Sequence, residues 1–440
     1  MTNRVVVIGG GASGLVAAIF AAQNGAKVTI LEHRDRVGKK LLMTGNGKCN
    51  LTNMNDVHGK YYSSDKNSLD KIYDALARFD ARETRKFFKS LGLYTKEKRD
   101  GGVYPVSEQA AVVVDVLRSA CASLNIRIIT ECEIEDIMVS KKGGQIRARQ
   151  YLHKEENQST VISGNEKKKA QEYLELEQKK VMIDYDRLIL ATGGRAAANS
   201  GSDGSGYQFA RSFGHHIVKP LPALVQLQCA GDFFRAIAGV RVQSIVQLYV
   251  DGSKVAIQDG ELQLTDYGIS GIPVFQLSRI AARALYDKKT CEVRINFIPF
   301  LAKQDMEQLF KKIENEHYQY KTVQELVAGL VHKKLAAMIC KQHKIRSEVT
   351  INHIKIQEIC SCVEHLADFR VHVTGTNSFE SAQVCSGGVS LTEVDETFQS
   401  KKCKNVYLVG ELLDCDGICG GYNLQWAWTT GAIAGKEAAK

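Results

Sequence analysis

Four residues near the amino terminus have the types and spacing to bind a dinucleotide. Gly9, Gly11 and Gly14 form the pattern G-x-G-x-x-G, and Glu32 follows further along the chain. In such a pattern the first glycine allows a tight turn, the second lets a pyrophosphate approach the backbone, and the third lets a helix pack closely on a strand. An acid at the position of Glu32 accepts a hydrogen bond from a ribose hydroxyl, which favours FAD or NAD over NADP.

A strand, a helix and a second strand must hold these residues in place. Residues 4–8 are mostly β-branched, residues 13–24 have apolar side chains at helical spacing, and residues 27–31 form a second apolar run. With Gly25 as a helix stop, they predict a Rossmann-like βαβ unit. Residues 5–22 contain no charged side chain, but glycines cluster among them, so we expect neither a signal peptide nor a membrane helix.

The composition is that of a large globular chain. Its 440 residues are enough for two or three domains, and 24% charged with 44% hydrophobic residues is ordinary for a soluble protein. The twelve cysteines show no disulfide-type spacing, so we expect reduced thiols and a cytoplasmic protein. Because Lys and Arg are interleaved with acids, we interpret the net charge of +9 as a solvated surface, or an attraction for an acidic small molecule.

Two later segments also run from apolar residues into glycines. Residues 186–190 lead into Ala191-Thr192-Gly193, and residues 405–409 lead into Gly410-Glu411 and a glycine-rich loop. Each pattern predicts a buried strand that ends in a turn.

Two motifs resemble those of a known family. Residues 38–53 have the pattern G-x-K-L-L-x-T-G-x-G-x-C-N-x-T-N, and residues 410–427 have G-E-x-x-D-x-D-G-x-x-G-G-Y-N-L-Q-W-A. Both resemble signatures of a bacterial FAD-dependent oxidoreductase family that includes aminoacetone oxidases and flavin reductases of 3-oxo-Δ4 bile acids. The resemblance implies FAD as the cofactor, and it implies that the strand near Ile134 meets the adenine through its backbone. The candidate cofactor-binding residues are Gly9, Gly11, Ala12, Ser13, Gly14, Glu32, Lys40, Thr44, Gly45, Gly47, Lys48, Cys49, Asn50, Ile134, Ala191, Thr192, Gly193, Gly410, Glu411, Asp416, Gly421, Tyr422, Asn423 and Leu424.

The carboxy-terminal motif also predicts how the chain would act on a flavin. We expect a helix opening near Asn423 or Leu424 to direct its N-terminal dipole at the negative charge of a reduced flavin ring. Tyr422 and Asn423 are positional candidates nearest the ring, while no catalytic acid and no metal ligand is predicted. Gly431 and Gly435 give the helix a thin face for close packing on a sheet.

The predicted fold class is α/β: a Rossmann-like FAD-binding domain of the two-dinucleotide-binding flavoprotein type, with a β-barrel-like insert and a helical insert. Closely spaced strands between residues 225 and 265 predict the barrel-like part, whereas residues 273–344 carry mostly helical patterns. A helical pattern also covers residues 68–91, and the charged residues 153–180 predict a solvated hairpin tip. The predicted boundaries are 1–194 and 382–440 for the FAD-binding domain, 195–268 and 345–381 for the β-rich insert, and 269–344 for the helical insert.

The resemblance leaves the reaction open. A reductase would pass a hydride from NADH or NADPH to an activated C=C bond, as in a 3-oxo-Δ4 steroid or bile acid. An oxidase would oxidise a small amine such as aminoacetone and release hydrogen peroxide. We favour the reductase, because the many cysteines suit a low-oxygen cell. No second G-x-G-x-x-G unit follows a strand-like run, so either a nicotinamide docks transiently over the flavin or the electrons come from elsewhere.

Two alternatives belong to other functional classes. A tRNA-modifying flavoprotein would have a continuous Lys/Arg face and salt-sensitive RNA binding. A flavin-bound sensor would use Cys415 and Cys419 as a redox pair. We expect a small-molecule substrate, no nucleic-acid partner and no membrane insertion, and the oligomeric state stays open.

Overall fold

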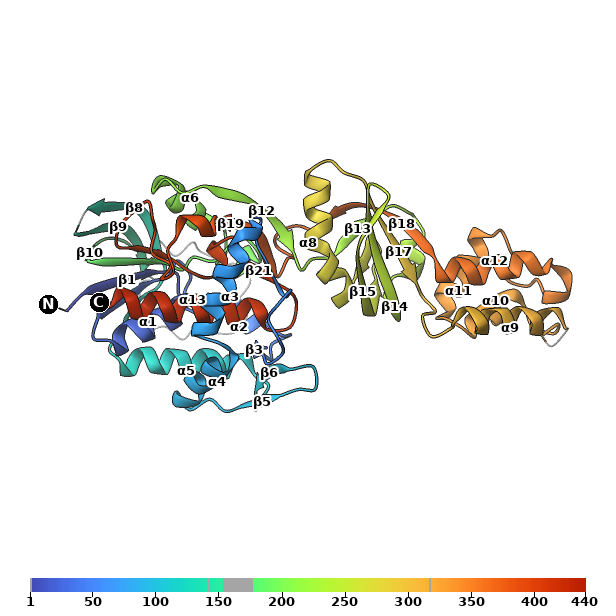
Figure 1. Ribbon diagram of the computed structural model, residues 1–440, viewed down its shortest axis with the longest axis horizontal. Helices are drawn as coiled ribbons and strands as arrows, with labels where there is room; N and C mark the ends of the chain where they lie inside the picture. The colour runs from blue at the N-terminus through green and yellow to red at the C-terminus, as the bar shows by residue number, and fades with distance from the viewer. Residues whose placement is uncertain (1, 141, 153–176, 316–317) are drawn as a thin grey trace, which may run out of the picture. The chain divides into compact units, whose positions relative to one another are not determined.

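The computed structural model describes residues 2–140, 142–152, 177–315 and 318–440 (Figure 1). The chain forms two compact units, each with its own hydrophobic core. The first unit comprises Met1–Pro220 and Gly387–Lys440, and the second comprises Leu221–Ser386. The finer domain boundaries expected from the sequence stay a prediction.

A five-stranded parallel sheet lies at the centre of the first unit, in the order β20-β11-β1-β2-β7. Val5, Val6 and Val7 are almost fully buried, as expected for a parallel sheet covered on both faces. Because β11 pairs with both β1 and β20, the ends of all three strands meet at one edge. The strands are β1 (Arg4–Ile8), β2 (Lys27–Leu31), β7 (Arg127–Ile129), β11 (Arg187–Leu190) and β20 (Val406–Leu408).

Two helices of the first unit touch through their backbones. A Cβ atom on Gly431 of α13 (Tyr422–Ala438) would lie 2.5 Å from the Ser13 carbonyl oxygen of α1 (Ala12–Gln23), and one on Gly435 would lie 2.3 Å from that of Ala17. The expected packing of this thin face on a sheet is therefore wrong, because the glycines let two helices approach closely instead. Among the described residues, no helix is both long enough and apolar enough to span a membrane.

The helix predicted over residues 68–91 is two helices, α3 (Leu69–Arg78) and α4 (Ala81–Ser90). Asp80 separates them, because its Oδ1 accepts hydrogen bonds of 2.8 Å from the backbone N–H groups of Arg82 and Glu83 and so starts α4 as an N-cap.

Smaller elements complete the first unit. The hairpin tip predicted over residues 153–180 lies mostly outside the described residues, and the antiparallel strands β9 and β10 flank it. The remaining helices are α2 (Lys39–Met43), α5 (Ala110–Ser123) and α6 (Ser205–Ser212). The antiparallel sheets contain β3 (Thr52–Asn53), β5 (Thr95–Glu97) and β6 (Gly102–Pro105), β8 (Cys132–Ser140), β9 (Gly143–Leu152) and β10 (Glu177–Tyr185), and β4 (Tyr61–Tyr62) with β21 (Asp416–Gly417).

The second unit contains a closed six-stranded barrel in the order β13-β16-β15-β14-β17-β18. Strand β17 lies within the range that the sequence predicted to be helical. It is a short alternating run between two helical segments, and pairing with β14 and β18 gives it its barrel position. The strands are β13 (Leu227–Cys229), β14 (Arg241–Val250), β15 (Ser253–Leu264), β16 (Gly268–Ser270), β17 (Cys291–Asn296) and β18 (Phe369–Thr376).

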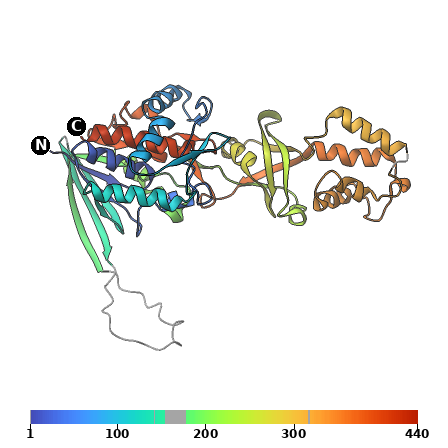
Figure 2. The same ribbon diagram turned by 90° about the horizontal axis from the view of Figure 1, so that it is seen from below.

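Among the described residues, four α-helices are inserted between the neighbouring barrel strands β17 and β18, and Figure 2 shows them gathered at one end of the barrel. One continuous core contains residues of both parts, such as Phe297 and Leu366. The inserted helices are α9 (Lys303–Glu314), α10 (Val323–Ala328), α11 (Lys333–Gln342) and α12 (Ile356–Ala367), and α8 (Ile272–Tyr286) lies against β15. The predicted α/β fold class with a barrel-like and a helical insert is confirmed.

Candidate cofactor site

The glycine turn after β1 leaves the start of α1 open. Gly9 has φ +102°, and a Cβ on it would lie 2.4 Å from the Ala191 carbonyl oxygen. A Cβ on Gly14 would lie 1.9 Å from the Gly9 carbonyl oxygen, whereas one on Gly11 would meet nothing within 4 Å. No described side chain caps α1, which begins at Ala12, and its first turn has no acid. The free N–H groups and positive end of α1 therefore suit an anion beside Gly11.

Glu32 lies at the end of β2, and the turn itself holds its carboxylate. Oε2 accepts a 2.8 Å hydrogen bond from the backbone N–H of Gly10, and Oε1 accepts a 2.9 Å bond from that of Arg34. The residue is only 8% exposed. A carboxylate has about four acceptor positions, so this arrangement leaves capacity for a ribose hydroxyl.

The strand predicted to meet the adenine starts beside Glu32. The backbone N–H of Cys132 donates a 3.0 Å hydrogen bond to the Glu32 carbonyl oxygen, and Ile134 lies two residues further along β8. The structure thus brings Ile134 to the Glu32 side of the candidate site.

Residues 191–193 follow β11 and lie against the glycine turn. The N–H of Ala191 donates a 2.8 Å bond to the Ile8 carbonyl oxygen. Thr192 has a buried Oγ1 without a hydrogen-bond partner among the described residues, and Gly193 has φ +72°. An unpartnered buried hydroxyl is costly, so Thr192 is a candidate to contact a bound group.

The two family-like motifs meet in space. A Cβ on Gly410 would lie 2.6 Å from Ser13 Oγ, and the Lys40 ammonium lies 2.7 Å from Glu411 Oε2. A Cβ on Gly421, which has φ +97°, would lie 2.7 Å from the Thr52 backbone. Segments far apart in the chain therefore form one site within the first unit.

Helix α13 begins at Tyr422, close to the predicted opening at Asn423 or Leu424. Gly421 is its N-cap, and within the described part of the chain no side chain caps this helix. Since the first internal bond runs from the Gln425 N–H to the Gly421 carbonyl oxygen, the N–H groups of residues 422–424 lie outside the helical ladder. They provide a second positive helix end in the same unit.

The side chain of Asn423 and the backbone carbonyl of Tyr422 hold the start of α13 to neighbouring segments. Asn423 Nδ2 donates to the Gly417 carbonyl oxygen at 2.7 Å, and its Oδ1 accepts from the Gly417 N–H at 2.8 Å. The Tyr422 carbonyl oxygen accepts a 2.8 Å bond from the Tyr61 hydroxyl. Asp416 is buried in β21, beside the loop before α13.

Residues 44–50 contribute a tight loop with one orphaned polar atom. Thr44 Oγ1 donates to the Leu41 carbonyl oxygen, and Gly45 and Gly47 have φ of +57° and +79°. Asn50 Oδ1 is buried without a partner among the described residues, and a Cβ on Gly421 would lie 2.9 Å from it. Asn50 therefore faces the start of α13 with an unused acceptor.

Lys48 and Cys49 are less suited to a cofactor in the structure as it stands. Lys48 is half-exposed, and its ammonium lies 2.9 Å from Glu108 Oε2. Burial raises the pKa of the Cys49 thiol to about 11, with a smaller opposing effect from Thr44. Cys49 therefore stays a neutral thiol and fills space.

The sensor alternative is not favoured by the state of its cysteines. Burial raises the pKa of the Cys419 thiol to about 12, and it raises that of fully buried Cys415 as well. Since the thiolate is the reactive form, both thiols are poor redox groups at neutral pH.

Sequence reasoning missed residues that hold the motifs together. Trp428 Nε1 donates a 2.8 Å bond to the Leu51 carbonyl oxygen, and Trp426 Nε1 donates a 3.2 Å bond to that of Gly410. Gln425 Oε1 accepts bonds from the hydroxyls of Thr52 and Thr84. The Q-W-A end of the carboxy-terminal motif was the available signal for Gln425 and Trp426, whereas Trp428 lies just beyond the motif.

The residues of the first unit fit an FAD. The open space at Gly11, the two uncapped helix ends and the acceptor Glu32 match a pyrophosphate, a reduced ring and a ribose hydroxyl. The orphaned buried atoms of Asn50 and Thr192 add hydrogen-bonding capacity for a bound group.

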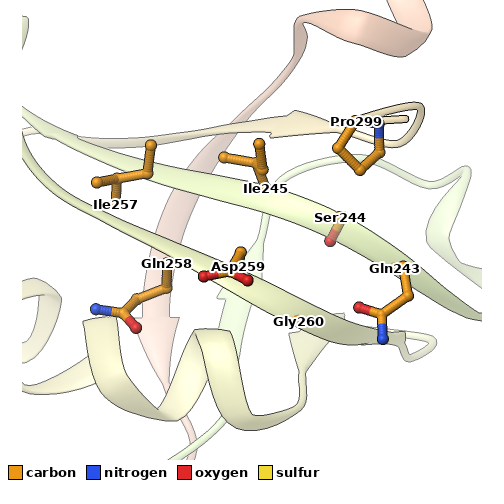
Figure 3. A pocket seen from close by; sticks show the side chains of 8 residues that line it. All are labelled: Gln243, Ser244, Ile245, Ile257, Gln258, Asp259, Gly260 and Pro299. Atoms are coloured by element: carbon orange, nitrogen blue, oxygen red, sulfur yellow. The ribbon is translucent and has the colours of Figure 1, made fainter. Parts of the chain in front are cut away.

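A separate pocket of about 440 Å³ lies in the second unit (Figure 3). Its Ser244 Oγ is buried without a hydrogen-bond partner among the described residues. None of the candidate cofactor residues lines it. The lining residues are Gln243, Ser244, Ile245, Ile257, Gln258, Asp259, Gly260 and Pro299.

Comparison with known proteins gives full-length matches. The family model described as "HI0933-like protein Rossmann domain" matches residues 3–166 and 147–437. A 3-dehydro-bile acid delta(4,6)-reductase of Clostridium scindens is 40% identical over 100% of this chain and 99% of its own length. Ribosomal RNA dihydrouridine synthases of Haemophilus influenzae and Escherichia coli are 27% and 25% identical, each over 97% of this chain and 96% and 95% of their own lengths.

Solved structures similar to this chain include two steroid enzymes. A 3-ketosteroid delta1-dehydrogenase from Sterolibacterium denitrificans has a TM-score of 0.49 at 11% identity, with 100% of both chains covered. A 3-ketosteroid-delta4-(5alpha)-dehydrogenase from Rhodococcus jostii RHA1 has a TM-score of 0.46 at 13% identity, covering 100% of this chain and 97% of the other.

Proposed function

Because the chain belongs to the HI0933-like protein family, we propose that it is an FAD-dependent reductase that adds a hydride to a C=C bond conjugated to a carbonyl. It is an FAD-dependent oxidoreductase, and the resemblance stated from its two motifs is confirmed. NADH or NADPH is the proposed hydride donor.

The chemistry shared by the relatives supports this proposal. A 3-dehydro-bile acid with delta(4,6) double bonds has a C3 carbonyl conjugated to C=C bonds, and uracil has a C5=C6 bond conjugated to its C4 carbonyl. The names of all three relatives describe saturation of such a bond. One reaction, hydride addition to the β carbon with protonation of the α carbon, accounts for both kinds of substrate.

The residues of the first unit have roles that suit this reaction. When bound, FAD supplies hydride transfer at its ring. The start of α1 at Gly11 would hold the pyrophosphate, and Glu32 would accept from a ribose hydroxyl. The free N–H groups at the start of α13, residues 422–424, would stabilise negative charge on a reduced ring.

The first substrate candidate is a 3-oxo-Δ4 steroid or bile acid, because the relative that is 40% identical over the whole chain is named for such a substrate. The second is a uridine within ribosomal RNA. It is favoured by the two relatives that are 27% and 25% identical over 97% of this chain and are named as ribosomal RNA dihydrouridine synthases, although the sequence alone led us to expect no nucleic-acid partner.

Product mass tests the proposal directly. FAD-loaded protein is incubated without oxygen with a 3-oxo-Δ4 bile acid and NADH or NADPH, and the product is analysed by mass spectrometry. We expect a gain of two hydrogens, one of them deuterium when the nicotinamide carries deuterium at C4. The matched control is heat-denatured protein with the same free FAD.

Two outcomes would count against the proposal. The first outcome is that neither a steroid nor a uridine-containing RNA gains hydrogens with either nicotinamide. Alternatively, aminoacetone would be consumed in air with equimolar hydrogen peroxide, which would favour the amine oxidase instead.

A further inference from the structure

The helical segment of the second unit carries a group of exposed basic residues. We call the group the basic α11 surface; it consists of Lys333, Lys334, Lys341, Lys344 and Arg346, all exposed. Lys334 and Lys341 are seven residues apart on α11, so they lie on the same side of the helix about 10 Å apart. The N–H of Lys344 bonds to the Lys341 carbonyl oxygen, which continues the surface past the helix end.

The lysines of this surface have no acidic partner within ion-pair distance among the described residues, and Arg346 has one acid near it, Glu348. In the adjoining barrel, Arg241 pairs with Glu261 at 3.3 Å and Arg294 pairs with Glu292 at 2.7 Å. By contrast, within the described part of the chain no ion pair involves a residue of the basic α11 surface. The Lys334 ammonium instead donates a 2.9 Å bond to the Ala238 carbonyl oxygen.

Local helix electrostatics explains only two of the five basic residues of the surface. Lys341 and Lys344 lie at the C-terminal end of α11, where a cation interacts favourably with the helix dipole. Lys333 and Lys334 are the first two residues of the same helix, and its first turn has no acid. Positive charge at that end opposes the dipole. Lys333 therefore suits an external anion better than it suits the isolated helix, while the Lys334 ammonium already bonds to the Ala238 carbonyl oxygen.

An exposed aromatic ring lies in the neighbouring chain segment. Tyr320 is 77% exposed. The Ile351 N–H donates a 3.0 Å bond to the Lys321 carbonyl oxygen, and the Val323 N–H donates a 3.1 Å bond to that of Val349. These bonds tie the segment of Tyr320 to the chain that follows Arg346. An exposed ring beside basic residues is the combination that binds unpaired bases and phosphates together.

The apolar residues of α11 argue against a lipid partner. Leu335, Ala336, Met338 and Ile339 are buried in the core of the second unit. An interfacial membrane helix needs its apolar face free to enter the lipid. The exposed side of α11 offers charge without such a face.

We propose that the basic α11 surface docks the phosphate backbone of structured RNA, with Tyr320 stacking on an unpaired base. This inference rests on the second substrate candidate above, a uridine in ribosomal RNA. It makes the helical insert the RNA-holding part of the chain and leaves hydride transfer to the first unit.

The test compares two triple variants of the full-length, FAD-loaded protein. K333Q/K341Q/K344Q removes three charges from the basic α11 surface. K254Q/K288Q/K289Q removes three exposed charges from the same unit. These control lysines lie near the end of β14 that is opposite Arg241. The Thr290 N–H, next to Lys289, bonds to Asp251, which follows β14 and lies roughly 30 Å along that strand from Arg241. The two sets are also matched in backbone conformation, because each includes one lysine with φ +60°: Lys344 in the first set and Lys288 in the second.

The measurement is equilibrium binding to protein-free ribosomal RNA over a salt titration. We expect the α11 variant to bind at least tenfold more weakly at low salt. We also expect its slope of log K against log salt to be smaller by about two to three, one unit per lost phosphate contact. The control variant K254Q/K288Q/K289Q should bind RNA with the affinity of wild type. K333R/K341R/K344R should also bind like wild type, because it keeps the three positive charges.

Several outcomes would overturn the inference. These are no RNA binding by wild type at low salt, equal losses in both triple variants, or equal affinity for heparin or for anionic lipid vesicles. NADH- or NADPH-driven bleaching of the flavin, measured on the same samples, separates this from failure of the proposed reaction. Bleaching with no RNA binding would reject only the docking surface, and a far-ultraviolet circular dichroism spectrum equal to that of wild type confirms that the second unit of each variant folds.

Discussion

Glu32 links the sequence pattern to a specific contact, and its replacement gives a residue-scale prediction. In Glu32→Gln the acceptor at one position becomes an N–H donor and the negative charge is lost. We expect the Kd for FAD to rise about tenfold to a hundredfold, because a hydrogen bond to a charged group contributes about 1.5–3 kcal/mol. Titration of the apoprotein with FAD, followed by flavin fluorescence, measures this change.

Asp35→Asn is the matched control for Glu32→Gln. Asp35 is a half-exposed neighbour whose carboxylate pairs with Lys39. Its neutralisation should leave the FAD affinity within about twofold, since exposed ion pairs contribute little. An unchanged Kd in Glu32→Gln would show that Glu32 makes no ribose contact.

His215 gives a prediction on pH. Its Nδ1 lies 3.0 Å from Glu393 and its Nε2 lies 2.8 Å from Ser400 Oγ. Burial lowers the pKa of His215, and Glu393 opposes that change. Below about pH 6.5 the unfolded chain takes up a proton that the folded imidazole does not, so the free energy of unfolding falls as pH falls. The loss ends once pH passes below the folded pKa.

Urea unfolding at several pH values measures the contribution of His215. His215→Gln removes the titrating group while keeping hydrogen-bonding atoms. We expect its stability to depend less steeply on pH than that of wild type in the window just below pH 6.5. Identical slopes in the two proteins would exclude His215 as a source of the pH dependence.

At the residue scale, the sequence predicted those positions whose role follows from local geometry. Gly9, Gly14 and Glu32 belong to one short unit in which spacing dictates position. The bond between Thr52 and Gln425 joins residues 373 positions apart, and no local pattern encodes it. The pairing of Lys48 with Glu108 likewise depends on how loops fold together.

At the scale of elements, the contact of α13 with α1 is sensitive to side-chain size. A Cβ on Gly435 would lie 2.3 Å from the Ala17 carbonyl oxygen, which is backbone and cannot move aside cheaply. Gly435→Ala should therefore lower the free energy of unfolding by about 1–3 kcal/mol. This is opposite in sign to the gain of up to about 1 kcal/mol that alanine gives at an open helix position.

Lys436→Ala is the control on the same helix. Lys436 is exposed, with its ammonium 4.9 Å from the centre of the Phe20 ring. Its loss should cost about 1 kcal/mol or less. Urea unfolding of both variants compares them, and a Gly435→Ala protein as stable as wild type would show that the helices can separate.

The predictions of helices and strands were wrong where an N-cap or a neighbouring element decided the structure. Asp80 divides a continuous helical pattern because its carboxylate caps α4. β17 lies between two helical segments, and its neighbours β14 and β18 are needed to recognise it as a strand. The thin face of α13 was recognised, but its partner was not, because glycine spacing does not show what approaches it.

For the whole molecule, the two cores predict unfolding in more than one step. The chain has two tryptophans, and both Trp426 and Trp428 are buried in the first unit. Tryptophan fluorescence therefore reports the first unit, whereas far-ultraviolet circular dichroism reports both. FAD at about 100 times its Kd should stabilise the first unit by about 2.7 kcal/mol.

Urea titrations with and without FAD test this division. We expect FAD to move the fluorescence transition to higher urea and to leave part of the circular dichroism transition unmoved. If the two signals shift together by the same amount, the units unfold as one. The sequence predicted the α/β fold class with its barrel-like and helical inserts, but the shared core of barrel and helices depends on contacts that no local pattern shows.

The most direct test of the proposed reaction is one visible absorbance experiment under anaerobic conditions. NADH and NADPH are added in turn to the FAD-loaded protein, and a 3-oxo-Δ4 steroid is added next. The proposal predicts rapid loss of the oxidised-flavin bands with a nicotinamide, and their return as the steroid gains two hydrogens. Bands that persist with both nicotinamides, or that return only when oxygen is admitted and peroxide forms, would contradict it.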